Sequence, residues 1–116
     1  RLLQDLVAIN SVNPQGDPGI PLSEANESAM ADYLGQYFRS IGLSVKRQEV
    51  YKNRPNILGF TDRKRGGGKR PSILLCPHTD TVSVVGMTID PFDPKMKGGR
   101  LYGRGSSDTK GPMSAM

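Results

Sequence analysis

The segment SILLCPHTDTV, residues 72–82, carries the strongest fold signal in this chain of 116 residues. Its first half is a short, continuously apolar run, which is typical of a strand covered on both faces. The run leads directly into His78, the only histidine of the chain, and Asp80 follows shortly after it. The pattern predicts a buried strand over Ser72–Cys76 that ends at the histidine, and open α/β sheets bind their ligands at such strand ends.

Upstream of this segment, apolar residues recur at helical spacing. The spacing predicts a short amphipathic helix from the N-terminus to Ile9 and a longer helix that starts at Ser23, its N-cap, and closes at Gly42. Glu27 falls in the predicted first turn of the longer helix. Between the two helices, residues 10–22 hold several prolines and glycines that interrupt regular structure.

Two further strands are predicted between the second helix and residue 72. Residues 43–48 alternate apolar and polar side chains, as on a strand with one wet face, and a second strand follows at Asn56–Thr61. Helix, strand, strand and buried strand is the element order of an α/β layer protein. The expected fold class is therefore α/β.

Downstream, Gly98-Gly99 separates Lys95–Lys97 from Arg100–Tyr102. Two glycines can take the positive φ values of a tight turn, so a small hairpin is predicted here. The hairpin leads through glycine-rich residues 103–107 to Asp108, which stands at the start of a last predicted helix.

Composition limits the chain to one small domain, because 116 residues with 35% hydrophobic side chains can form only one modest core. No stretch approaches the roughly 20 apolar residues of a membrane span, so no membrane partner is expected. Cys76 is the only cysteine and cannot form an internal disulfide, which suits a reducing compartment and an expected cytoplasmic location. Its place in the apolar run indicates a small buried side chain rather than a metal ligand.

The formal charge of +5 is concentrated in residues 62–71, which contain five of the lysines and arginines. Basic runs can bind phosphate backbones. This one has no aromatic residue for base stacking and no helical periodicity. A solvated loop between two strands is the favoured interpretation, and no nucleic-acid partner is expected.

The chemistry of the chain is concentrated at His78, Asp80 and Asp108. A neutral imidazole can bind a divalent metal while a neighbouring carboxylate holds its second nitrogen. A lone histidine is a weak signal, because such residues are often structural or merely exposed. Asp108 strengthens it as a second candidate ligand at the end of another predicted element, and this donor pair suits zinc or a similar ion.

Several motifs resemble the M20 family of metallopeptidases and amidohydrolases. They are HTDTV at 78–82, DPF at 90–92 and LYGRGSSDTKGPMSAM at 101–116, and LLQDLVAINSVNP at 2–14 and PNILGFT at 55–61 agree with them. The resemblance covers essentially the whole chain. It implies a three-layer α/β catalytic domain in which helices cover both faces of a mixed central sheet.

The resemblance also implies roles for single residues. His78 matches a ligand of one zinc, Asp108 matches the carboxylate that bridges two zincs, and Asp80 matches the catalytic acidic residue that supports the histidine. Two Zn²⁺ ions per complete site are implied, with Co²⁺ as a possible substitute. The family commonly has glycine before the histidine, whereas this chain has Pro77.

The implied activity is hydrolysis of an amide bond of small N-acyl amino acids, of the deacetylase or desuccinylase type. A dipeptidase or carboxypeptidase of the same family, or a non-catalytic metal-binding or interaction fragment, are the alternatives. The paired glutamates and later ligands of the family have no match, because every glutamate precedes His78. Residues 1–116 are therefore expected to be the N-terminal part of the catalytic domain, inactive alone. The lid domain, through which a homodimer would form, is expected beyond Met116.

Overall fold

The structure, a computed structural model, describes residues 1–15, 21, 26–61 and 71–116. This part of the chain is a mixed α/β fragment. Its helices and strands are α1 (Leu2–Ala8), α2 (Ser28–Ser40), β1 (Ser44–Tyr51), β2 (Arg54–Phe60), β3 (Lys95–Lys97), β4 (Arg100–Tyr102) and α3 (Lys110–Ala115).

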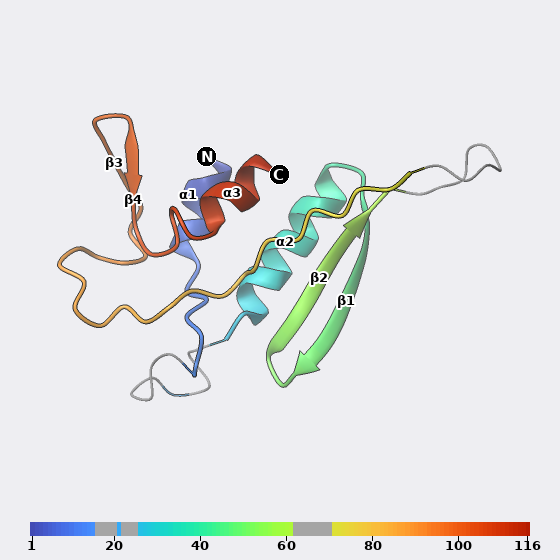
Figure 1. The fold of residues 1–116 in the computed structure, drawn as a ribbon, viewed down its shortest axis with the longest axis horizontal. Coiled ribbons are helices and arrows are strands. Elements are labelled where there is room, and N and C mark those ends of the chain that lie inside the picture. The colour runs from blue at the N-terminus through green and yellow to red at the C-terminus, as the bar shows by residue number, and fades with distance from the viewer. Residues whose placement is uncertain (16–20, 22–25, 62–70) are drawn as a thin grey trace.

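The elements form two groups (Figure 1). In one group, α2 packs along the hairpin of β1 and β2. In the other, α1 and α3 pack against each other near the hairpin of β3 and β4. The chain after residue 71 runs from the first group past α2 to the second, so it crosses the middle of the molecule.

The β1–β2 hairpin confirms the two strands predicted from residues 43 to 61. The strands are antiparallel, with Val45 opposite Gly59 and Arg47 opposite Ile57. Gly59 lets α2 approach the sheet closely, because a Cβ atom there would lie only 2.8 Å from the Phe38 ring. Arg47 also joins β1 to α2, since its guanidinium contacts the Asp32 carboxylate and donates to the Ser28 hydroxyl.

The second helix begins later than the sequence predicts. It starts at Ser28, whose N–H donates to the Asn26 side chain over 3.0 Å. Glu27 is the N-cap instead of a first-turn residue, and its carboxylate accepts three hydrogen bonds from Arg54 of β2 at 2.7–3.0 Å. The helix does not run unbroken from the predicted start, because Asn26 and Glu27 are not helical; Ser23 itself lies outside the described residues.

The core joins the first two helices, as their helical periodicity predicts. Leu6 of α1 packs with Met30 and Leu34 of α2, and all three are buried. The Tyr33 hydroxyl adds a polar tie between the helices by donating to the Asp5 carboxylate over 3.0 Å. Partly buried side chains surround the cluster: Leu2, Ile9, Tyr33, Phe38, Ile57 and Met113.

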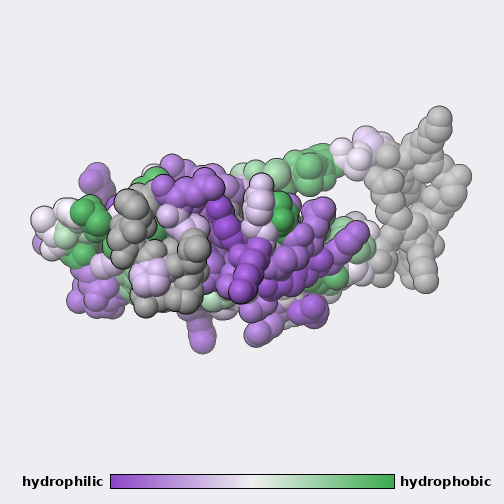
Figure 2. All heavy atoms as spheres, turned by 90° about the horizontal axis from the view of Figure 1, so that it is seen from below, coloured by the Kyte–Doolittle hydropathy of each residue, from purple (hydrophilic) through white to green (hydrophobic). Residues whose placement is uncertain are grey.

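The predicted buried strand at Ser72–Cys76 is wrong for this structure. These residues form no strand, and Ile73 and Leu74 are 89% and 82% exposed. Cys76, expected to be buried, is exposed as well. The physical reason is that a central strand needs partners on both edges and cover on both faces, and the described residues provide neither. Hydrophobic spheres therefore reach the molecular surface among hydrophilic ones (Figure 2).

The C-terminal elements follow the sequence prediction. Gly98 and Gly99 adopt positive φ values of 58° and 74° in the turn between β3 and β4, and α3 follows Asp108. Both sheets within the described residues are two-stranded and antiparallel. The mixed α/β class is thus confirmed, whereas the three-layer arrangement around a mixed central sheet stays a prediction.

Two expectations concern other parts of the molecule. The predicted basic loop falls mainly on residues 62–70, which lie outside the described residues. Among the described helices, none is long and apolar enough to cross a membrane.

We predict that Glu27→Ala lowers the free energy of unfolding by about 3 kcal/mol, because Arg54 would keep its charge and lose its buried partner. Glu27 is only 4% exposed. Glu49→Ala is the matched control, since Glu49 is about half exposed and should cost less than about 1 kcal/mol. Urea unfolding of both variants measures the difference; equal losses would contradict the anchoring role of Glu27.

Candidate metal centre

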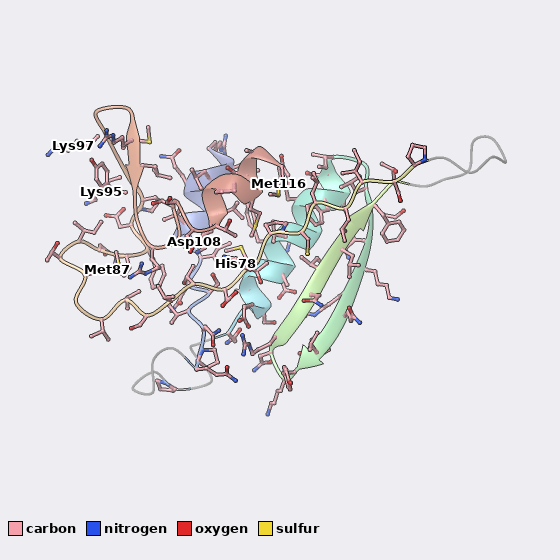
Figure 3. All side chains as sticks on the ribbon, in the orientation of Figure 1. His78, Met87, Lys95, Lys97, Asp108 and Met116 are labelled. Atoms are coloured by element: carbon pink, nitrogen blue, oxygen red, sulfur yellow. The ribbon has the colours of Figure 1, made fainter. Side chains whose placement is uncertain are left out.

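His78 and Asp108 come from two separate segments and lie close together (Figure 3), and Asp80 contacts the same imidazole ring. Nε2 of His78 lies 3.0 Å from Oδ1 of Asp108, and Nδ1 lies 3.0 Å from the backbone oxygen of Asp80. Oδ1 of Asp80 lies 3.2 Å from the same Nδ1. A proton on Nδ1 is therefore held by Asp80, which leaves Nε2 facing Asp108.

The segment after α1 holds the histidine segment in place. Val12 and Thr81 form a parallel β-bridge. The Asn13 N–H donates to the Thr81 oxygen over 2.7 Å, and the Thr81 N–H donates to the Ser11 oxygen over 2.9 Å. Val12, Ser11 and Thr81 are all buried, so the bridge fixes the backbone next to Asp80 from the interior of the molecule.

The loop before Asp108 is fixed by its close approach to that bridge. Gly105 has a φ of +80°, and a Cβ atom there would lie 2.8 Å from the Thr81 methyl group. Only glycine combines this backbone conformation with this contact at little cost. Arg104 anchors the loop further, because its N–H donates to the Pro91 oxygen over 2.7 Å and its guanidinium donates to the Ser83 oxygen over 2.6 Å.

Lys110 lies directly beneath the loop and is only 1% exposed. Its ammonium group donates to the Ile9 oxygen over 2.7 Å, and its N–H donates to the Gly105 oxygen over 3.0 Å. Burial lowers the pKa of Lys110 to about 8, because desolvation disfavours the charged form. Lys110 thus joins the start of α3 to the end of α1.

The electrostatics of the centre favour a positive charge at His78. Partial burial lowers the His78 pKa, but the hydrogen bonds to Asp108 and to the Asp80 backbone, together with both carboxylates, outweigh it and raise the pKa above its ordinary value. Asp108 is the more accessible carboxylate, with 87% of its side chain exposed. A bound cation would take the place of the imidazole proton, because only a neutral imidazole nitrogen can be a ligand.

The three side chains line a cleft of about 250 Å³. Residues 103–107 form the rest of its wall, together with Thr81 and Val82. A larger cleft of about 680 Å³ lies against β3 and β4, but its polar lining consists of lysine, arginine, aspartate and tyrosine side chains without a histidine or cysteine. We place the candidate centre in the smaller cleft, because it holds the donor types that transition metals bind.

The donor set fits zinc in type, although not in number. An imidazole nitrogen and a carboxylate oxygen are both ordinary zinc ligands, and a structural or catalytic zinc needs three or four protein ligands. Within the described residues, no group of three His, Cys, Asp or Glu side chains could hold a metal ion. A complete zinc site would therefore need further ligands besides His78 and Asp108.

Sequence reasoning named the three central residues but missed those that hold them. Asn13 donates from Nδ2 to Oδ2 of Asp80 over 3.0 Å. That contact joins residues far apart in the chain, and no spacing rule indicates it. The contacts of Arg104 with Ser83 and of Lys110 with Ile9 were likewise not predicted; a buried lysine beside a candidate ligand carries no periodic signal.

Comparison with known proteins gives one matching family. The model of "Peptidase family M20/M25/M40" matches residues 74–116, which include the whole candidate centre.

Similar proteins extend the likeness upstream. Acetylornithine deacetylase of Photorhabdus laumondii is 33% identical over 115 residues, which cover 96% of this chain and 28% of that protein. Succinyl-diaminopimelate desuccinylase of Buchnera aphidicola is 31% identical over 119 residues, covering 100% of this chain and 27% of that protein. N-formyl-4-amino-5-aminomethyl-2-methylpyrimidine deformylase of Bacillus subtilis is 30% identical over 94 residues, which cover 78% of this chain and 22% of that protein. The chain spans about a quarter of the length of these curated relatives.

We predict that stability rises with pH between about 8 and 10.5 through Lys110. Its pKa in the folded protein, about 8, lies below the ordinary 10.5. In this window the unfolded chain binds more protons than the folded one, so raising the pH favours folding. Lys110→Met should remove this contribution. Urea unfolding of both proteins at several pH values measures it, and equal pH slopes would contradict the prediction.

Proposed function

This chain belongs to peptidase family M20/M25/M40, and we propose that it forms part of a di-zinc hydrolase that cleaves an amide bond of small N-acyl amino acids. The observation that carries the proposal is the meeting of His78 Nε2 and Asp108 Oδ1, 3.0 Å apart, in a cleft inside the segment that matches the family. The names of the relatives, a deacetylase, a desuccinylase and a deformylase, support an acyl group on nitrogen as the target.

In this proposal His78 and Asp108 would hold Zn²⁺, for which Co²⁺ is a possible substitute. Bound zinc supplies Lewis acidity, which activates water and polarises an amide carbonyl. Asp80 accepts a hydrogen bond from the Nδ1–H of His78, which fixes the ring and raises the basicity of Nε2. The exposed position of Asp108 leaves the cleft open to a small substrate.

Within the described residues, no group of three His, Cys, Asp or Glu side chains could hold a metal ion, so the proposal takes the remaining ligands and the general base from outside them. We propose that residues 1–116 are the N-terminal part of a catalytic domain that further chain completes. The exposed apolar side chains of residues 73–75 support this, because a strand that continues the sheet would cover them. A homodimer formed by another domain and a cytoplasmic location are parts of the same proposal.

We predict that the full-length protein, loaded with zinc, releases the acyl group from N-acetyl or N-succinyl amino acids. His78→Ala and Asp108→Ala should each lower kcat/KM by at least about 100-fold, because each removes a metal ligand. The activity is measured as the release of free amine from acetylornithine, succinyl-diaminopimelate and simple N-acetyl amino acids.

Asp93→Ala is the control, since Asp93 is exposed and contacts Lys95 away from the cleft. It should keep the activity of the unaltered protein. Dipeptides and peptides with a free carboxyl terminus test the dipeptidase and carboxypeptidase alternatives. Turnover of those alone would correct the substrate class, and no turnover of any of them by the metal-loaded protein would contradict the hydrolase proposal.

A further inference from the structure

We propose that Asn13 is a positioning residue of the metal centre, which acts on the metal only through Asp80 and His78. The inference rests on the proposed function, since it assumes that His78 is a metal ligand. It adds a residue from the segment after α1 to a centre that otherwise comes from residues 78–80 and 108.

The carboxylate of Asp80 is held on both of its oxygens. Oδ1 faces Nδ1 of His78 at 3.2 Å, and Oδ2 accepts a hydrogen bond from Nδ2 of Asn13 at 3.0 Å. A third of the Asp80 side chain is exposed, so burial alone does not fix its rotamer. Without the amide of Asn13, the carboxylate would be free to turn towards water and the imidazole would lose its support.

Asn13 is itself held in one orientation. Its N–H donates to the Thr81 oxygen over 2.7 Å, which ties its backbone to the residue after Asp80. Its Oδ1 accepts from the Gln15 N–H over 2.9 Å. Because the oxygen of the amide accepts from Gln15, the NH₂ group must face Asp80, so the donor is aimed before any metal binds.

The chemical nature of the donor suits a cation site. A lysine or arginine in this place would pair with Asp80 and repel a metal ion nearby. A neutral amide holds the same carboxylate and adds no positive charge beside the imidazole. The series of contacts Asn13–Asp80–His78–Asp108 therefore contains one neutral amide donor, one supporting carboxylate and the two proposed ligands.

Calorimetric titration of Zn²⁺ into the full-length protein tests this role. Asn13→Leu keeps the size of the side chain and removes the donor, and it should weaken zinc binding by about 10-fold or more. Asn56→Leu is the matched control, because Asn56 is exposed on β2 and its amide contacts only Gln48, at 3.4 Å, in the described structure. It should bind zinc as the unaltered protein does.

A double-mutant cycle separates positioning from general destabilisation. In the Asp80→Ala background, Asn13→Leu should change the zinc affinity by less than about 2-fold, because its only route to the metal is gone. Asn13→Ser guards against misfolding, since its hydroxyl can still accept from Gln15 but is too short to reach Asp80. It should lose zinc affinity as Asn13→Leu does, with thermal unfolding showing a folded protein.

The outcomes are distinct. Zinc binding that is lost in His78→Ala but unchanged in both Asn13 variants would overturn the role of Asn13 and leave the metal centre standing. An equal loss from Asn13→Leu with and without Asp80 would also overturn it, because the effect would not pass through Asp80. Absence of zinc binding by the unaltered protein would overturn both this inference and the proposed function.

Discussion

Two backbone hydrogen bonds join Thr81 to Ser11 and Asn13, and the candidate centre is built around them. They fix the histidine segment against the chain that leaves α1. Gly105 then packs against the Thr81 methyl group, which brings the loop of Asp108 to the same place. The segments that contain His78 and Asp108 thus pack against the same buried residue, Thr81.

The charges of the candidate centre favour a positive charge at His78. Two carboxylates face the two ring nitrogens of His78 and raise its pKa despite the desolvation. The ammonium group of the buried Lys110 donates to the Ile9 oxygen. Its lowered pKa shows the cost of burying that charge, and its contacts with Ile9 and Gly105 hold the Asp108 loop in place.

Local patterns predicted the elements that local forces determine. Helical spacing located α1 and most of α2, and the glycine pair located the turn at residues 98 and 99. Distant contacts were not predictable, such as the hydrogen bonds that Arg54 of β2 donates to Glu27, the N-cap of α2. The apolar run at residues 73–75 predicted burial, but these side chains are exposed. An apolar pattern does not show which part of a protein would cover it.

The same division holds at the candidate centre. His78, Asp80 and Asp108 were predictable because they lie in short sequence motifs, and the structure brings them together. Asn13 and Lys110 were not recognised as partners of Asp80 and Ile9, since an amide and a lysine become informative only when the fold shows what they touch. The roles of the three motif residues in metal binding stay predictions.

Anomalous X-ray scattering at the zinc absorption edge, from crystals of the full-length protein grown with zinc, tests the central claim most directly. We expect an anomalous peak within bonding distance of Nε2 of His78 and of a carboxylate oxygen of Asp108, at the roughly 2.0–2.2 Å of zinc–ligand bonds. Asp80 should remain on Nδ1 and outside bonding distance. A peak elsewhere, or zinc bonded to Asp80 instead of His78, would contradict the account.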